Sequence, residues 1–352
     1  MAPVLRRRFR RPGPPTIDGM KAIVQERYGS SETLRLRDID RPSPAAGEVL
    51  VRVRAAAVNA RDWHIMRGDP MLARLAMPSD FGWTGPKRTV RGSDFAGVVE
   101  AVGPGVTTYA PGDEVYGDLR EDDGAFAEYA RVPLGNLARK PAGLTFAQAA
   151  AVPLAGTTAL AALRDAGKVR PGQHVLVNGA SGGVGTFAVQ LAKVFGATVT
   201  GVCSTRNAEL VAELGADHVV DYTREDFTRS GHRYDVLLDL VGNRSLRACR
   251  RALAADGRLV IAGGGVSGGG RPSLVGPMSL VIRANAARLR DKRIVPLSNV
   301  PPSPQSLATL REHLEAGEIT PAVDRTFPLD RAAEAVRYLE IDHARAKVVI
   351  TL

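Results

Sequence analysis

The residues best suited to chemistry lie in one glycine-rich stretch, HVLVNGASGGVGTFAVQLAKVFGATVTGVC, which spans residues 174–203. An apolar run typical of a buried strand leads into a turn, and the turn leads into a helical pattern. The first N–H groups of such a helix have no backbone partner, and together with the helix dipole they form an anion site. Glycines keep that site open to a pyrophosphate, and Ala180, Gly182 and Gly185 stand at the three positions of the G-x-G-x-x-G pattern. A second strand follows within 20 residues, which favours a dinucleotide site over a plain tight turn. The predicted binding residues are Gly179, Ala180, Ser181, Gly182, Gly183, Val184 and Gly185.

The end of the second strand indicates which dinucleotide is bound. A site for NAD usually carries Asp or Glu there, to bind the ribose diol. Here the strand ends in GVCSTRN, and the first acidic residue, Glu209, already lies in the next helical pattern. Ser204, Thr205 and Arg206 instead offer hydroxyls and a guanidinium, which suit a 2′-phosphate. We therefore predict NADP(H) as the cofactor.

The elements that must position these residues alternate between strands and helices. Apolar runs occur at 175–177, 199–202, 219–220, 236–240 and 259–262, with helical patterns between them. Continuous Val and Leu runs predict parallel strands that are buried on both faces. Ligands of such sheets bind at the carboxyl ends of the strands, so Ala262, Gly263 and Gly264 are expected to pass beside the nicotinamide.

The rest of the chain has a different texture. Residues 21–140 read as short strands broken by turn residues, and residues 145–166 read as a helix interrupted near Pro153. The last segment carries one helix and one strand, too little to fold alone, and we expect it to return to the first unit. The predicted division is a disordered extension (1–19), the first part of a catalytic domain (20–143), a nucleotide-binding domain (144–300) and a return to the catalytic domain (301–352).

Composition excludes several other classes. The chain of 352 residues suits two domains, and no window approaches the roughly 18 uninterrupted apolar residues of a membrane span. The formal charge is +10, but the first 19 residues hold five Arg against one Asp, and no basic run with interleaved aromatics follows. Nucleic-acid binding is therefore not favoured. Cys203 and Cys249 form no C-x-x-C pair, so neither a four-thiolate zinc lobe nor a disulfide framework is indicated, and the cytoplasm is the expected location.

With these residues in hand, the chain resembles the medium-chain dehydrogenase/reductase superfamily, and within it the zinc-independent quinone oxidoreductase and enoyl reductase branch. The motifs that carry the resemblance are VNARDWHIMRG (58–68), GSDFAGVVEAVG (92–103), GDEVYG (112–117), AAVPLAGTTAL (150–160), GASGGVG (179–185), LGADHVVDY (214–222) and HARAKVVI (343–350). The resemblance implies an α/β protein with a GroES-like β catalytic domain and a Rossmann domain, an active site in the cleft between them, and a homodimer.

Zinc is not expected. Zinc alcohol dehydrogenases of this superfamily hold the metal with a Cys in the first motif, a His in a Gly-His-Glu motif and a third ligand near the link to the Rossmann domain. Here those positions carry Asn59, Gly92-Ser93-Asp94 and Leu154–Ala155. Asn, Ser and Ala cannot form the N/S ligand set that Zn²⁺ prefers. His64 remains nearby, but one histidine is not a site and is more often a packed or exposed residue.

Without a metal, the carbonyl loses its Lewis acid. The reaction that fits is hydride transfer to a quinone or an α,β-unsaturated carbonyl compound, because the charge that develops there is delocalised. In that reaction the cofactor supplies the chemistry and the protein supplies orientation and hydrogen bonds.

The resemblance also assigns individual residues. It implies that Asn59 lies near the nicotinamide and that Thr158 contacts the cofactor. Tyr222 is implied to pack beside the 2′-phosphate, and Lys347 to lie near the cofactor. The branch often has Lys where this chain has Asn207, and Arg206 is the residue expected to substitute for it.

The proton donor is not fixed by any motif. Asp62 adjoins Asn59 and is a catalytic candidate, although a structural hydrogen bond is the more ordinary role for it; solvent could also protonate the product. Two other readings stay open: an alcohol or aldehyde dehydrogenase without zinc, and a weakly active NADPH-binding protein with a regulatory, structural or RNA-binding role.

Overall fold

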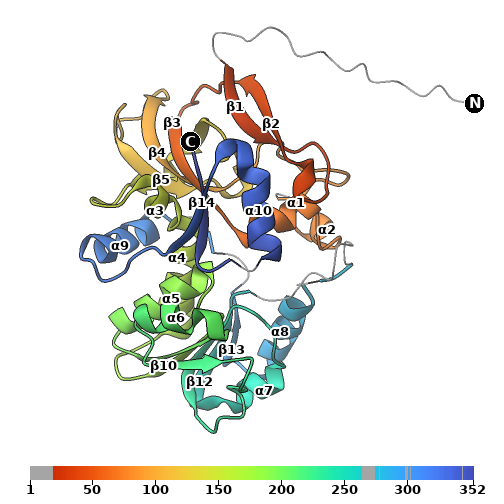
Figure 1. Ribbon diagram of the computed structural model, residues 1–352, viewed down its shortest axis with the longest axis vertical. Helices are drawn as coiled ribbons and strands as arrows, with labels where there is room; N and C mark the ends of the chain where they lie inside the picture. Colours follow the sequence, from red (N-terminus) through yellow and green to blue (C-terminus); the bar gives the residue numbers. More distant parts are fainter. Residues whose placement is uncertain are drawn as a thin grey trace, which may run out of the picture.

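The computed structural model describes residues 19–78, 80–263, 274–276, 278–297, 300–301, 303–342 and 344–352. Within them the chain forms a β-rich unit and a unit built on a parallel sheet, which lie at opposite ends of the long axis (Figure 1). The predicted α/β fold with a GroES-like and a Rossmann-like unit is confirmed. The extension predicted over residues 1–19 falls mostly outside the described residues, and Gly19 already opens the first strand, β1 (Gly19–Val24).

The parallel sheet has six strands in the order β10-β9-β8-β11-β12-β13. This is the doubly wound order 3-2-1-4-5-6, whose reversal point lies between β8 and β11. The strands are β8 (His174–Asn178), β9 (Thr198–Cys203), β10 (His218–Asp221), β11 (Tyr234–Asp239), β12 (Leu253–Ile261) and β13 (Ile294–Pro296). The apolar runs are buried on both faces: Val175 and Val177 belong to one hydrophobic cluster, and Leu176 belongs to another.

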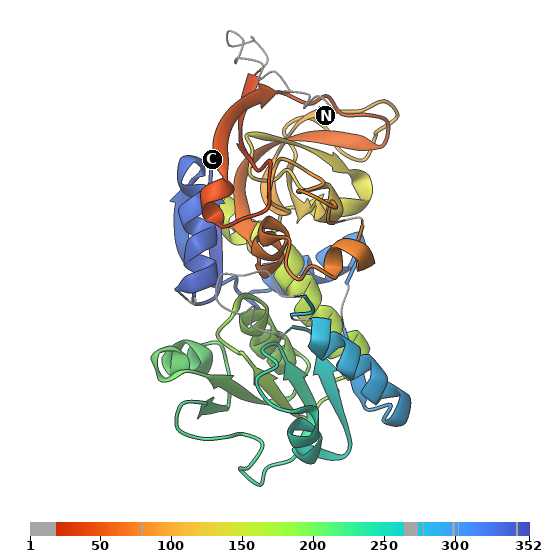
Figure 2. The same cartoon turned by 90° about the vertical axis from the view of Figure 1, so that its right-hand side faces the viewer.

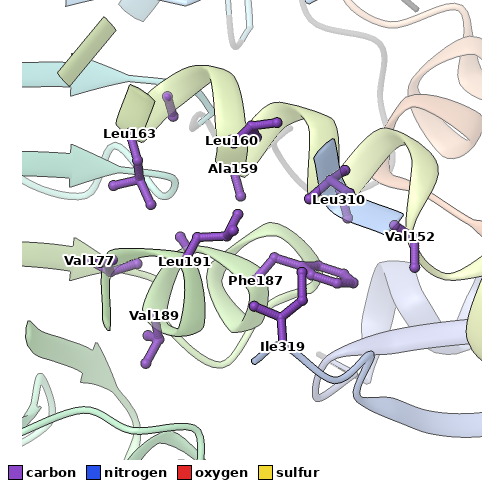
Figure 3. Packing of buried hydrophobic residues seen from close by; sticks show 14 of the residues in the cluster. Val152, Ala159, Leu160, Leu163, Val177, Phe187, Val189, Leu191, Leu310 and Ile319 are labelled. Atoms are coloured by element: carbon purple, nitrogen blue, oxygen red, sulfur yellow. The ribbon is translucent and has the colours of Figure 1, made fainter. Parts of the chain in front are cut away.

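Helices cover both faces of this sheet. They are α5 (Gly183–Val194), α6 (Ala208–Glu213), α7 (Leu246–Arg251) and α8 (Met278–Arg290). The helix expected near Pro153 is interrupted as predicted, into α3 (Phe146–Ala150) and α4 (Pro153–Leu160), and the π-helix η4 (Ala161–Gly167) continues α4. Figure 3 shows the apolar layer between α4 and α5, where Leu160 and Leu191 share one cluster with Leu310 of α9 (Pro304–Glu315).

The β-rich unit is organised by a seven-stranded sheet in the order β14-β15-β3-β4-β5-β7, with β6 also paired to β3. Its strands are β3 (Glu48–Val58), β4 (Asp94–Val102), β5 (Glu114–Asp118), β6 (Tyr129–Pro133), β7 (Leu137–Arg139), β14 (Val323–Pro328) and β15 (Lys347–Thr351), and β1 pairs with β2 (Arg35–Asp40) beside it. The helices here are α1 (Ala60–Arg67), α2 (Ala73–Ala76) and α10 (Ala332–Ile341). Short 3₁₀ turns occur at η1 (Ser31–Thr33), η2 (Arg120–Asp122), η3 (Leu134–Asn136), η5 (Thr205–Asn207) and η6 (Leu329–Arg331).

The C-terminal strand joins the two units. β15 pairs antiparallel with β3, where Val348 lies opposite Val58. One residue before β15, the Ala346 N–H donates to the Ser181 carbonyl at 2.8 Å, in the glycine-rich turn of the other unit. Figure 2 shows α10 and this C-terminal segment beside the β-rich unit, above the parallel sheet. The chain thus brings its last residues to the junction at which the predicted cofactor site lies.

Candidate functional site

The glycines of the glycine-rich turn are required for different physical reasons. Gly179 adopts φ +92°, a conformation that a side chain disfavours, and it makes the turn at the end of β8. Ala180 follows with its N–H bonded to the Val202 carbonyl at 3.0 Å, and it has no positive φ. A methyl group is therefore tolerated at the first position of the pattern. At the third position, a Cβ on Gly185 would lie 2.1 Å from the Gly179 oxygen, so only glycine lets α5 begin this close to the turn.

Gly182 has a separate role. It is the N-cap of α5, and a Cβ built there would meet no protein atom closer than the Gly179 oxygen at 3.5 Å. The space beside it belongs to a cavity, which a pyrophosphate on the first turn of a 12-residue helix would use. The turn therefore fits the phosphates of a dinucleotide.

A cavity of about 1410 Å³ extends from this turn to the β-rich unit. Its nucleotide side is formed by the glycine turn and by residues at the carboxyl ends of β8, β9, β11 and β12. Its far side is formed by α1 and the segment after it, together with α8 and the residue that follows β13. The apolar side chains there are Ile65, Ala73, Met77, Phe81, Met278, Val281 and Leu297, and the charged residues Arg61, Asp69, Asp80, Arg120 and Glu121 also line the cavity.

Most of the predicted site residues line this cavity, the majority of them on its nucleotide side. The lining includes Thr158, Gly179, Ser181, Gly182, Gly183, Val184, Gly185, Ser204, Thr205, Arg206, Tyr222, Ala262 and Gly263. Ala180, Asn59, Asp62 and Lys347 are buried behind it and do not line it. Gly264 lies outside the described residues. The roles given to these residues remain predictions.

Asn207 is a site residue that sequence reasoning did not select. Its side chain is 5% exposed and lines the cavity, and its Nδ2 donates to the Ser181 Oγ at 3.0 Å. Its Oδ1 is buried and has no hydrogen-bond partner among the described residues. A buried acceptor without a partner costs stability, which a ligand hydroxyl at this point would relieve. The only sequence signal was its place after the second strand, where the branch often carries Lys.

A polar group also stands at the reversal point of the sheet. Asn178, the last residue of β8, donates through Nδ2 to Asp239 Oδ1 at 2.8 Å and to Asn243 Oδ1 at 3.0 Å. Asp239 Oδ1 further accepts the Val241 and Gly242 N–H groups. Asn178 and Asn243 line the cavity, and this bonding holds both side chains in fixed positions.

At the predicted 2′-phosphate end, a carboxylate stands close to the hydroxyls. Thr205 Oγ1 donates to Asp221, and Thr223 donates to the same carboxylate. These bonds hold the pKa of Asp221 below its usual range. The Thr205 proton is thereby engaged. Ser204, Arg206 and Tyr222 also line this end of the cavity, and Arg206 Nη2 lies 3.5 Å from the Asp342 carbonyl oxygen.

Asp62 is tied into a buried ionic group under α1. Its Oδ2 accepts the Asn59 N–H at 2.7 Å and so closes a capping box at the start of α1. The side chain is 2% exposed, and burial, followed by the nearby Asp123, raises its pKa to about 6. Arg61 and Arg91 oppose that shift. The geometry favours the structural hydrogen bond over the acid role.

This raised pKa gives Asp62→Asn a pH-dependent effect. The neutral carboxyl is favoured in the folded state, so the contribution of Asp62 to stability is full below the ordinary pKa and is lost as pH rises from about 4 to about 6. Asn cannot ionise and still accepts from the Asn59 N–H. Between about pH 4 and pH 7 the free energy of unfolding of the variant should therefore improve, relative to wild type, by up to about 3 kcal/mol.

Urea unfolding at both pH values measures this difference. Asp165→Asn, at an exposed carboxylate, serves as the control and should show little change. The same offset between Asp62→Asn and wild type at both pH values would contradict the prediction.

The positions of the zinc ligands in related dehydrogenases do not fit a metal here. Asn59 offers an amide, Ser93 a buried hydroxyl and Leu154 only its backbone, and no group of three or more His, Cys, Asp or Glu suited to a metal occurs in the described part of the chain. The ammonium of Lys347 bonds to Asn59 Oδ1 at this place.

His64 is a packed side chain, one of the two ordinary roles that the sequence suggested, and it also lines the cavity. Its ring stacks on Trp63 at 3.7 Å between centroids, and its Nδ1 lies 3.3 Å from the Asp69 carbonyl oxygen. Burial lowers its pKa, so the ring is mainly neutral at pH 7.

Comparison with known proteins identifies families and structures that resemble this chain. The alcohol dehydrogenase GroES-like domain family matches residues 45–142, and the zinc-binding dehydrogenase family matches residues 214–350. A 2-methylene-furan-3-one reductase of Solanum lycopersicum is 35% identical, over 94% of this chain and 79% of its own. An NADPH-dependent alkenal/one oxidoreductase of Arabidopsis thaliana is 36% identical, with the same coverages. The structure of a quinone oxidoreductase from Coxiella burnetii superposes with a TM-score of 0.80 at 29% identity, covering 95% of this chain and 99% of that one.

Among the described helices, none has the length and apolar content needed to cross a bilayer. The relatives match this chain across both units, from the β-rich domain through the glycine turn to the last strand. This chain belongs to the medium-chain dehydrogenase/reductase superfamily.

Proposed function

We propose that this protein is a zinc-independent oxidoreductase that uses NADPH to reduce quinones or α,β-unsaturated carbonyl compounds. The observation that carries the proposal is a single cavity that joins the glycine turn to a compartment with apolar side chains from α1, the segment after it and α8. This compartment lies next to zinc-ligand positions that carry Asn, Ser and Leu. The names of the relatives, an alkenal/one oxidoreductase and a quinone oxidoreductase, agree with such a substrate class.

The position of each residue in the cavity determines its proposed role in binding the cofactor or the substrate. When bound, NADPH supplies a hydride from its nicotinamide. The glycine turn and the first turn of α5 would hold the pyrophosphate, and Asn207 would accept a hydrogen bond from a hydroxyl of the cofactor. Ala262 and Gly263, after β12, would border the nicotinamide end. The apolar side chains of the far side would pack against a flat conjugated substrate and orient it, and electron delocalisation within the substrate would replace a Lewis acid.

Turnover assays test the proposal directly. The metal-stripped protein is given NADPH, and NADH in parallel, with quinones, enones and simple aldehydes. Oxidation of NADPH with quinones or enones supports the proposal. Turnover of simple aldehydes alone would favour an alcohol or aldehyde dehydrogenase, a zinc requirement would overturn the metal argument, and tight NADPH binding without turnover would favour a regulatory or interaction protein.

Arg206→Ala tests the NADPH preference. The guanidinium is the cavity cation at the predicted 2′-phosphate end, and a hydrogen bond to a charged group contributes roughly 1.5–3 kcal/mol before solvent screening reduces it. The Michaelis constant for NADPH should therefore rise about tenfold more than that for NADH. Arg224→Ala is the control, because Arg224 lies near the same end of the chain segment and pairs with Asp221 at 3.5 Å, but it is 75% exposed and does not line the cavity. Equal effects of Arg206→Ala on both cofactors would contradict the assignment.

A homodimer and a cytoplasmic location complete the proposal. Both follow from the sequence arguments given above, and neither is needed for the chemistry. Sedimentation and fractionation of the native protein test them.

A further inference from the structure

Lys347 is a buried cation at the place where several segments of the β-rich unit meet. Its side chain is about 3% exposed; its Nζ bonds to Asn59 Oδ1 and lies 3.5 Å from Asp94 Oδ2. Asp94 is fully buried and accepts two further hydrogen bonds, from Asn59 Nδ2 at 3.0 Å and from the Leu154 N–H at 3.1 Å. The ammonium and the carboxylate thus tie the start of α1, the start of β4, the start of α4 and the start of β15 into one cluster.

The residues of the cluster stand at the sequence positions where zinc-dependent members of the superfamily carry their metal ligands. Asn59, Ser93-Asp94 and Leu154 are the places where the zinc alcohol dehydrogenases described above carry their ligands. Here a positive charge is still present at that place, but it is attached to the chain through the side chain of Lys347. A buried ammonium is tolerated only when it is paired and hydrogen-bonded, and Asp94 and Asn59 meet both conditions.

The stem of Lys347 reaches the cofactor turn. A Cβ on Gly183 would lie 2.9 Å from the Lys347 Cδ, so the stem packs against the first residue of α5. The preceding residue, Ala346, forms a backbone bridge to Gly182 and donates to the Ser181 carbonyl at 2.8 Å. One side chain therefore touches the glycine turn with its stem and the β-rich unit with its ammonium.

We propose that Lys347 is a positioning residue: an internal cation in the place of the metal, whose bonds to Asn59 and Asp94 fix the glycine turn relative to the substrate half of the cavity. This inference rests on the proposed function, because what it positions is the cofactor against the substrate. Hydride transfer depends steeply on geometry, and a displacement of about 1 Å can cost on the order of a hundredfold in rate.

Lys347→Met keeps most of the stem and removes the ammonium. We expect kcat to fall about ten- to a hundredfold, while the Kd for NADPH changes less than about threefold, because the phosphate contacts of the turn are retained. The kinetic isotope effect with NADPH deuterated at the transferred position should increase, since hydride transfer then limits turnover. Lys193→Met is the control, at a half-exposed lysine that pairs with Asp217 and leaves the cavity untouched.

A second readout needs no turnover. The chain has two tryptophans, Trp63 and Trp83, and both lie in the β-rich unit. Energy transfer from them to bound NADPH therefore reports where the nicotinamide lies relative to that unit. Lys347→Met should change the transfer efficiency and Lys193→Met should not; unchanged kcat and unchanged transfer in Lys347→Met would overturn the proposal.

The variant Lys347→Met/Asp94→Asn separates positioning from charge balance. Burial raises the pKa of Asp94 to about 7, and Lys347 opposes that shift. Lys347→Met alone removes this opposing charge, so ionising the buried carboxyl becomes more costly and the urea midpoint is expected to fall, whereas Asn at position 94 cannot ionise. A double variant that regains the wild-type midpoint but keeps the low kcat and the altered energy transfer supports the proposal, also where the single variant does not fold. A double variant that regains the wild-type urea midpoint, kcat and energy-transfer efficiency would show that the pair serves stability alone, and this result would overturn the proposal. If wild type reduces no quinone or enone, the proposed function fails, and the energy transfer still decides the role of Lys347.

Discussion

Gly185→Ala is expected to weaken NADPH binding more than tenfold and to lower the stability of the fold. The added methyl would lie 2.1 Å from the Gly179 oxygen and 2.8 Å from the Ala180 backbone, and backbone atoms cannot move aside as a flexible side chain can. Overpacking of this kind typically costs about 1–3 kcal/mol. Because the atoms that must shift are those of the phosphate-binding turn, the same displacement opens the anion site, and 1.4 kcal/mol already corresponds to about tenfold in affinity.

Two matched glycines make the measurement specific. Gly135→Ala adds a methyl where no atom lies within 4 Å, so it should change neither the urea midpoint nor the Kd for NADPH. Gly182→Ala adds a methyl that points at no close protein atom but stands on the cavity wall, so it should weaken NADPH binding while it leaves the midpoint near that of wild type. Gly185→Ala should change both quantities. Equal NADPH affinity in Gly185→Ala and Gly135→Ala would contradict the role assigned to the turn.

The features that sequence predicted well are those set by local patterns. The Val and Leu runs predicted the parallel strands because a strand covered on both faces needs apolar residues at every position, as at 175–177. Pro153 predicted the break between α3 and α4 because proline lacks the N–H that a continuing helix needs. The glycine turn could be read in the same way, since its steric needs fall within seven residues.

The features that sequence missed depend on contacts between distant residues. Lys347 and Asn59 are 288 positions apart, and the local sequence around either residue does not predict that the ammonium contacts the amide. Asn207 differs from an ordinary helix-start asparagine only in that the fold buries its Oδ1 without a partner. The type of a residue limits what it can do, but its tertiary surroundings decide which of these roles it takes.

A buried ion network under α1 leads to the last prediction: Asp123→Asn should destabilise the protein by about 3–5 kcal/mol. Asp123 accepts from Arg61 Nη1 at 2.9 Å and from Arg91 Nη1 at 2.7 Å, and the side chains of Asp123 and Arg91 are each 2% exposed. Asp and Asn have the same side-chain shape, so the strained backbone of this residue, with φ 51° and ψ −176°, affects wild type and variant alike. The substitution removes the charge that pairs with Arg91, and it leaves Arg61 with Asp80 as its remaining carboxylate partner in the described structure. It also turns an NH₂ group toward one of the two guanidinium groups.

The neighbouring residue provides a control of the same chemistry in a different environment. Asp122 pairs with Arg88 at 2.6 Å, but both side chains are about half exposed, so Asp122→Asn should cost less than about 1 kcal/mol. Urea unfolding at pH 7 compares the two variants, and similar losses would contradict the importance of burial. Arg61 also lines the cavity, on the side away from the glycine turn. Loosening its hold should therefore raise the Michaelis constant for the quinone or enone more than that for NADPH, which connects the stability of this network to the shape of the substrate compartment.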